Sequence, residues 1–127
     1  MLYTVTTNTD LQTIKDEIAA KAKEHGFGVL TEYPFQKILQ EKGHPIEKDI
    51  TVFEICNPVA AQEVLSTHPE VSVYLPCRVS LYEQNGKAVL STIDVNDMIK
   101  NFDLDDTFKA HMHEVFEIMK KLLASWK

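Results

Sequence analysis

Apolar and polar positions alternate along this chain with two periods, one typical of strands and one typical of helices. Residues 2–6 and 77–83 alternate at every second position, which indicates strands with one buried face. After the first of these strands, apolar residues recur at helical spacing, at Leu11, Ile14, Ile18 and Ala22. The chain therefore combines strands and helices instead of repeating one kind of element.

The same patterns predict the remaining elements. Further strands are expected at residues 27–33, 50–55, 71–74 and 87–94, and further helices at residues 34–42, 58–68, 97–102 and 103–126. Thr9 is predicted to cap the first helix, with Gln12 reaching back to it in a capping box. Asn57 and Pro58 predict the start of another helix, because asparagine is a good N-cap and proline suits the first helical position.

The pair Asn85-Gly86 is the strongest hairpin signal in the sequence, since both residues tolerate the positive φ of a type I′ turn. A two-residue loop fixes the register of the flanking strands, so Gln84 is expected to face Lys87. Continuing outward, Cys77 is expected to face Asp94, with their Cβ atoms about 5 Å apart on one side of the sheet.

The last helix carries one continuous apolar stripe. Its members are Phe108, Met112, Val115, Met119, Leu122 and Trp126. This stripe is too short for a coiled coil, so we interpret it as a face that packs on the sheet or is shared with a second subunit. Together the elements predict an α+β fold: a two-layer domain over residues 1–127, with a mixed, largely antiparallel sheet of about five strands, packing helices and a long C-terminal helix.

Charge and composition exclude several partners. The net charge is −6, and Arg78 is the only arginine among 13 cationic residues, so no basic stripe is available for nucleic acid. No apolar run approaches the roughly 20 residues that span a bilayer, and we expect no membrane contact. The two cysteines, Cys56 and Cys77, follow no positively charged leader, so the expected location is cytoplasmic, with both thiols reduced.

Four stretches, in order along the chain, resemble the domain-of-unknown-function family 302. They are residues 26–32 (GFGVLTE), 55–58 (ICNP), 75–79 (LPCRV) and 90–94 (LSTID). The resemblance implies a compact α+β domain with a mixed sheet, often a homodimer. It implies no established activity.

Four residues in or beside these stretches form the candidate site: Cys56, Asn57, Cys77 and Asp94. A helix N-terminus at Asn57 offers free N–H groups and positive potential. Two thiols and a carboxylate are expected at strand ends nearby, where sheets of α/β type often place ligands. The spacing of histidines and acidic residues favours no metal site; His113 and Glu117, for example, are expected to form a solvated pair on one helix.

The chemistry of the two cysteines is open at this point. Proximity to a helix N-terminus lowers the pKa of a thiol, whereas Glu54 beside Cys56 and Asp94 beside Cys77 raise it. Both cysteines are also explained as small buried apolar residues, with Asn57 and Asp94 acting only as helix caps. We expect a non-enzymatic homodimer that binds a small ligand or cofactor of unknown identity. The alternative is a cysteine-dependent redox or sulfur-transfer enzyme.

Overall fold

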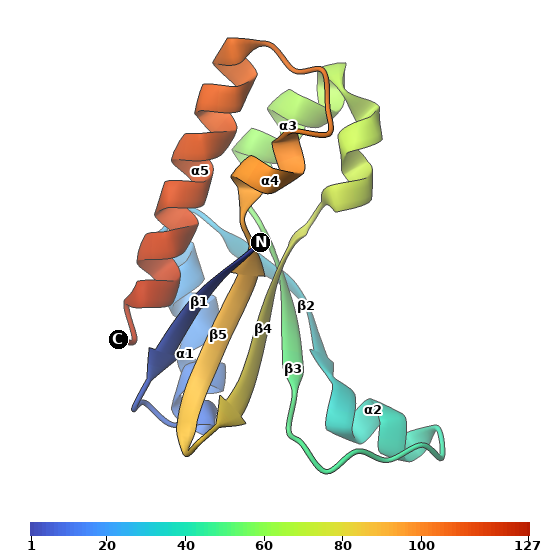
Figure 1. Cartoon of the computed structure of the whole chain (residues 1–127), viewed down its shortest axis with the longest axis vertical. Helices are drawn as coiled ribbons and strands as arrows, with labels where there is room; N and C mark the ends of the chain where they lie inside the picture. The colour runs from blue at the N-terminus through green and yellow to red at the C-terminus, as the bar shows by residue number, and fades with distance from the viewer.

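The computed structural model describes all residues 1–127 and contains one five-stranded sheet in the order β1-β5-β4-β3-β2 (Figure 1). The strands are β1 (Leu2–Thr7), β2 (Gly28–Pro34), β3 (Thr51–Cys56), β4 (Cys77–Gln84) and β5 (Lys87–Ile93). The helices are α1 (Leu11–Glu24), α2 (Phe35–Glu41), α3 (Pro58–Thr67), the 3₁₀ helix η1 (Pro69–Tyr74), α4 (Val95–Ile99) and α5 (Asp106–Ala124). The predicted α+β class is confirmed, and every strand pair is antiparallel.

The helices are distributed unevenly around the sheet. Helices α1 and α5 pack on one face, while α3, η1 and α4 gather beyond one end of the strands (Figure 1). The opposite face carries no helix across it, and α2 projects from its edge (Figure 1). The sheet is therefore covered on one side only.

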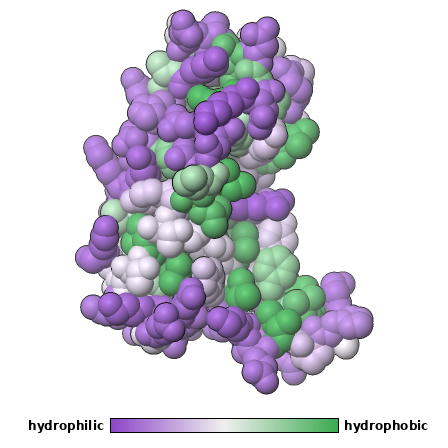
Figure 2. Space-filling view, in the orientation of Figure 1, coloured by the Kyte–Doolittle hydropathy of each residue, from purple (hydrophilic) through white to green (hydrophobic).

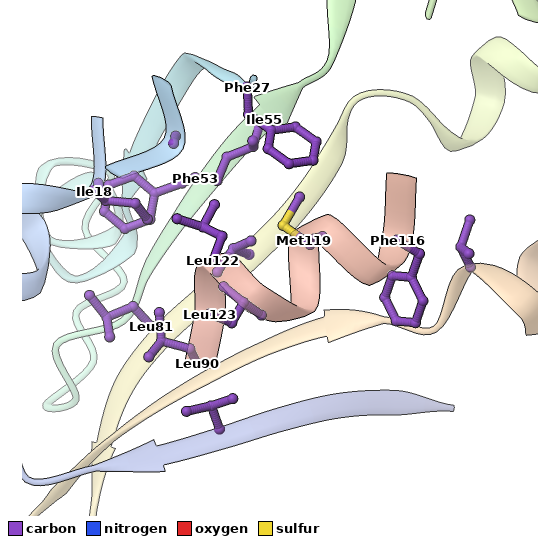
Figure 3. Close-up of a cluster of buried hydrophobic side chains, with 14 of the residues drawn as sticks. Ile18, Phe27, Phe53, Ile55, Leu81, Leu90, Phe116, Met119, Leu122 and Leu123 are labelled. Atoms are coloured by element: carbon purple, nitrogen blue, oxygen red, sulfur yellow. The ribbon is translucent and has the colours of Figure 1, made fainter. Parts of the chain in front are cut away.

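The core lies between the sheet and the pair α1 and α5 (Figure 3). Alternate residues of the strands point into it, as the sequence pattern predicts, and several are completely buried: Ile55, Val79, Leu81 and Leu90. From the helices, Ile14, Leu122 and Leu123 are equally inaccessible. The apolar stripe of the last helix thus packs on the sheet of its own chain over its C-terminal half.

The hairpin register is confirmed from its turn outward. Asn85 and Gly86 have φ values of 55° and 77°, and the β4–β5 ladder runs from Gln84↔Lys87 to Ser80↔Ser91. The ladder ends there, and β5 itself ends at Ile93. The expected pairing of Cys77 with Asp94 is therefore wrong, because Asp94 has already left the sheet to begin α4.

Two local predictions are wrong for identifiable reasons. Asp10, not Thr9, caps α1: its carboxylate accepts the Thr13 N–H at 2.7 Å, while the Thr9 hydroxyl donates to the Trp126 carbonyl at 3.1 Å. The strand expected at residues 71–74 is the 3₁₀ helix η1. A strand would place Val71 and Val73 on the same side, whereas Val71 is buried and Val73 is 82% exposed.

The helix boundaries shift by a few residues from the sequence estimate. Helix α4 begins at Val95, earlier than expected, and α5 begins at Asp106, behind the cap Asp105. Trp126 then anchors the end of α5 to α1, because its indole N–H donates to the Glu17 carboxylate at 2.9 Å and Lys21 lies 4.4 Å above its ring. None of the helices combines the length and the apolar character needed to cross a membrane.

Packing of α5 predicts a large cost for shortening one of its core residues. We expect Leu122→Ala to lower the free energy of unfolding by about 2–5 kcal/mol, since the side chain is fully buried and leaves a cavity. Leu30→Ala is the matched control, because Leu30 is 62% exposed and should cost less than about 0.5 kcal/mol. Urea unfolding followed by circular dichroism measures both, and equal losses would contradict the packing.

Candidate functional site

A cavity of about 220 Å³ lies beyond the end of the sheet, under the middle of α5. Its walls come from β3, α3, η1, β4, β5, α4 and α5, so elements from most of the chain converge on it. Seventeen of its 21 lining residues are hydrophobic. A mainly apolar hollow with a few polar groups is the usual form of a small-molecule site.

The cavity lies where the strands stop pairing. Beyond Ser80↔Ser91 the β4–β5 ladder gives way to one side-chain contact, in which the Thr92 hydroxyl donates to the Arg78 carbonyl at 2.8 Å. Arg78 and Thr92 both line the cavity. Helices that continue past the sheet therefore have no strand beneath them at this point, and the space remains open.

Cys56 and Asn57 form the wall where β3 passes into α3. Cys56 is the last residue of β3, and Asn57 caps α3, its side-chain oxygen accepting the Ala60 N–H at 3.1 Å. Pro58 at the start of α3 confirms the predicted helix start. Burial raises the pKa of the Cys56 thiol, and the predicted lowering by the helix N-terminus does not prevail.

Cys77 begins β4 and pairs with Ile55, the neighbour of Cys56, so both thiols reach the same cavity. Burial, with a smaller contribution from Cys56, raises the pKa of the Cys77 thiol from 9.0 to about 11. Both cysteines are free of any disulfide. Neutral thiols are weak nucleophiles and weak metal ligands, so the surroundings do not activate either cysteine.

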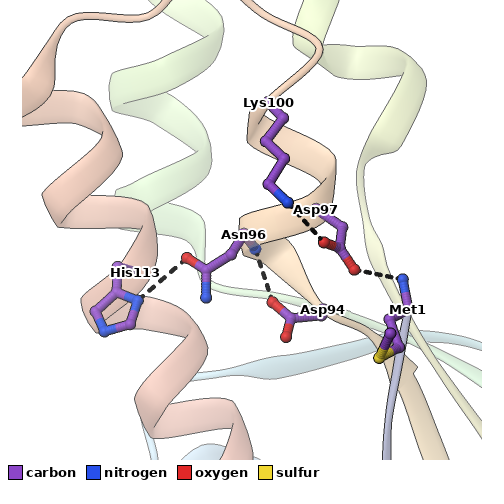
Figure 4. Close-up of polar contacts among 6 residues, drawn as sticks. All are labelled: Met1, Asp94, Asn96, Asp97, Lys100 and His113. Atoms are coloured by element: carbon purple, nitrogen blue, oxygen red, sulfur yellow. Dashed lines mark hydrogen bonds and ion pairs between the residues drawn. The ribbon is translucent and has the colours of Figure 1, made fainter.

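Asp94 is the one predicted site residue that does not line the cavity. Its carboxylate accepts the Asn96 N–H at 2.8 Å and so caps α4 (Figure 4). Asn96 in turn contacts His113 of α5 at 3.2 Å, and Asp97 of the same helix binds the amino group of Met1 (Figure 4). Asp94 thus positions α4, which contributes two apolar side chains to the cavity wall.

Sequence reasoning missed the roof of the cavity. Met112, Val115 and Met119 of α5 line it, although they belong to the stripe that we assigned to sheet packing or a second subunit. The stripe serves two purposes: its middle, from Met112 to Met119, covers the cavity, and its C-terminal end, with Leu122 and Trp126, closes the core. Helix α5 extends past the ends of the strands. The sequence alone does not show this, because it depends on where the sheet lies relative to the helix.

Outside the cavity, two histidines form ion pairs with glutamates near the surface. His111 lies 3.1 Å from Glu63, and His113 lies 3.6 Å from Glu117 as expected for an i, i+4 pair. No three histidine, cysteine or acidic side chains come together as a set that could hold a metal ion. The cavity is therefore the best candidate for a functional site.

Comparison with known proteins assigns the chain to a family. The model of the family described as Domain of unknown function DUF302 matches residues 3–126. The chain belongs to this family. The resemblance seen in the four sequence stretches is thereby confirmed, and it extends through α5.

Two proteins similar to this DUF302 domain differ in how much of the chain they match. A crystal structure of an uncharacterized conserved protein DUF302 from Bacillus stearothermophilus is 27% identical, covers 98% of this chain and 93% of its own, and superposes with a TM-score of 0.79. An uncharacterized protein of Aquifex aeolicus (strain VF5) is 32% identical over 54 residues, which are 42% of this chain and 38% of the relative. The matched region thus spans well under half of the Aquifex protein.

The raised pKa of Cys77 in the DUF302 domain predicts an alkaline loss of stability. In the unfolded chain the thiol ionises near pH 9.0, whereas in the folded chain it ionises near pH 11. The contribution of the neutral thiol to the free energy of unfolding is therefore full below pH 9 and is lost as the pH rises toward 11. We expect the stability of Cys77→Ala to fall less steeply over this window. Urea titrations at a series of pH values make the comparison with the wild type; Cys56→Ala should also flatten the alkaline loss, because burial raises the pKa of that thiol too.

The same shift predicts slow alkylation. In the Cys56→Ala variant, the remaining thiol of Cys77 should react with iodoacetamide at a rate that rises only well above pH 8.5, the usual thiol pKa. A midpoint below about pH 8 would show an activated thiolate and contradict this account of the site.

Proposed function

We propose that this protein is a non-enzymatic binding module that holds one small, uncharged and largely apolar molecule in the cavity beside Cys56, Asn57 and Cys77. The observation that supports the proposal most strongly is the lining itself, with 17 hydrophobic residues of 21 around about 220 Å³. An apolar cavity of about 150 Å³ suffices to bind benzene. This one has room for a substituted or fused aromatic ring, or for a short branched chain of similar volume.

Charge on the ligand would be unfavourable in this cavity. Arg78 is the one charged residue of the lining, but its side chain is 71% exposed and lies 3.6 Å from the Glu54 carboxylate. The thiols are neutral at physiological pH, since burial raises the pKa of both. Without a free counter-charge, an anion or cation would lose its hydration with no compensation.

The polar groups at the cavity wall suit recognition of one hydrogen-bonding substituent. Two thiols offer weak donors and polarisable sulfur, and Met112 and Met119 add further sulfur to the opposite wall. Asp94 supports the site indirectly through α4. The alternative, a thiol enzyme, requires a thiolate, and the raised pKa of both cysteines weighs against it. We also propose that the protein is a homodimer and acts in the cytoplasm, where free thiols stay reduced.

Filling the cavity should abolish binding without unfolding the protein. Ala61 lines the cavity on α3 and is only partly buried, so Ala61→Phe projects a ring into the space. We expect the affinity for 2-naphthol, followed by its fluorescence, to fall at least about tenfold, or about 1.4 kcal/mol. Ala110→Phe on the exposed side of α5 is the matched control and should bind as wild type does.

Charge selectivity provides the second half of this test. Naphthalene-2-sulfonate has the same ring system as 2-naphthol but carries a fixed negative charge, so it should bind far more weakly. Binding of neither compound to the wild-type protein would contradict the proposed function. Equal binding of both would contradict the argument from charge.

The contribution of the thiols can be measured separately. Replacing Cys56 and Cys77 together by Ala removes two polarisable atoms from the wall, and we expect 2-naphthol affinity to fall by about threefold to tenfold. Unchanged affinity in a variant with a wild-type circular dichroism spectrum would show that the cysteines only fill space.

A further inference from the structure

Only a few polar groups reach the cavity. The surface over the helices beyond the sheet is mostly hydrophilic (Figure 2), whereas the lining beneath it is mostly apolar. Besides the two weakly polar thiols, its polar groups are the side chains of Asn57, Arg78 and Thr92 and the hydroxyl of Tyr74. What each of these groups already binds within the protein decides what it can offer to a ligand.

Arg78 and Thr92 have little left to offer as hydrogen-bond donors. The Thr92 hydroxyl donates to the Arg78 carbonyl at 2.8 Å, so its proton is already used. The Arg78 guanidinium lies 3.6 Å from the Glu54 carboxylate, and the side chain is 71% exposed, so water can hydrate it. A ligand that replaced this water would exchange one hydrogen bond for another and would gain little.

Asn57 differs from these residues, because half of its amide group is unused. Its side-chain oxygen accepts the Ala60 N–H at 3.1 Å and so caps α3. This bond fixes the orientation of the amide, since the atom that faces an N–H must be the oxygen. The NH2 group then lies on the other side and donates to no group of the protein. The residue is partly buried at the cavity wall, so a donor with two N–H bonds remains for a ligand.

We propose that the Asn57 NH2 group recognises a carbonyl oxygen, and that the ligand is a neutral carbonyl compound with an aromatic or branched apolar body. A carbonyl oxygen accepts hydrogen bonds and donates none, so it complements a free donor. An alcohol also accepts, but it brings a proton of its own, and the Asn57 oxygen is already engaged by Ala60. This inference rests on the proposed function, because it names the ligand class of the same cavity.

The Tyr74 hydroxyl is the competing donor of the lining. Tyr74 belongs to η1, and its ring packs edge-on against Phe102, with 5.1 Å between the ring centroids. Because 36% of the residue is exposed, water competes with a ligand for the hydroxyl. Replacing Tyr74 by Phe should therefore leave the affinity for a carbonyl compound nearly unchanged, and this variant serves as the control.

Two ligands of the same shape test the role of Asn57. Methyl 2-naphthyl ketone has a carbonyl oxygen where 2-isopropenylnaphthalene has a CH2 group. Asn57→Asp removes the NH2 donor but keeps an oxygen that can cap α3, since Asp and Asn are equally good N-caps. By equilibrium dialysis, we expect this variant to bind the ketone at least about tenfold more weakly and the hydrocarbon within about twofold of wild type. Tyr74→Phe should change neither affinity by more than about twofold.

The carbonyl group also reports the hydrogen bond in the wild-type protein, without any substitution. A hydrogen bond to a ketone oxygen lowers the frequency of its infrared stretching band. Isotope-labelled methyl 2-naphthyl ketone bound to the wild-type protein should therefore absorb at a lower frequency than it does in hexane. In Asn57→Asp the band should return toward its position in hexane, whereas a purely structural role of Asn57 would leave the band unchanged.

The outcomes separate this inference from the proposed function. If neither compound binds to the wild-type protein, the proposed function is overturned and this inference with it. If both bind and the carbonyl band of the bound ketone is unshifted, only the role of Asn57 is overturned. Equal loss of both ligands in Asn57→Asp, or loss of the ketone in Tyr74→Phe alone, overturns that role as well. Selective loss of the ketone in Asn57→Asp, together with the shifted band in the wild type, supports it.

Discussion

The packing of α5 across one face of the sheet is the constraint on which the other features depend. Its C-terminal half places Leu122 and Leu123 against the strands, and this contact closes the core. Because the helix is longer than the strands, its N-terminal half continues past the end of the sheet, where α3, η1 and α4 meet it around a cavity. Because α1 and α5 occupy the same side, the other side of the sheet remains without a cover.

The fold could be predicted from the sequence wherever one residue pattern has one physical solution. Asn85-Gly86 fixed the hairpin, and Pro58 behind Asn57 fixed the start of α3. The prediction was wrong where tertiary contacts decide which of several locally possible structures forms. Thr9 has the chemistry of an N-cap, but its hydroxyl is used by the Trp126 carbonyl, 117 residues away. No local pattern carries that information.

The candidate site, too, was predicted from the sequence only in part. Cys56, Asn57 and Cys77 could be brought together from strand pairing and helix starts, and the structure does place them around one cavity. Asp94 was assigned by extending the hairpin register beyond the point where the strands still pair. The roof of the cavity could not be foreseen, since Met112 and Met119 show the same spacing whether the surface below them is a sheet or an open space.

The order in which the elements leave the ribosome gives the position of α5 another meaning. The five strands and α1 all precede α5 in the chain, so nascent protein complete up to residue 93 already has the sheet sequence but lacks the helix that covers Leu81 and Leu90. That intermediate exposes apolar strands on a face that is later buried, which is the condition under which chains aggregate or recruit chaperones. The native core is therefore complete only once the last helix has been synthesised.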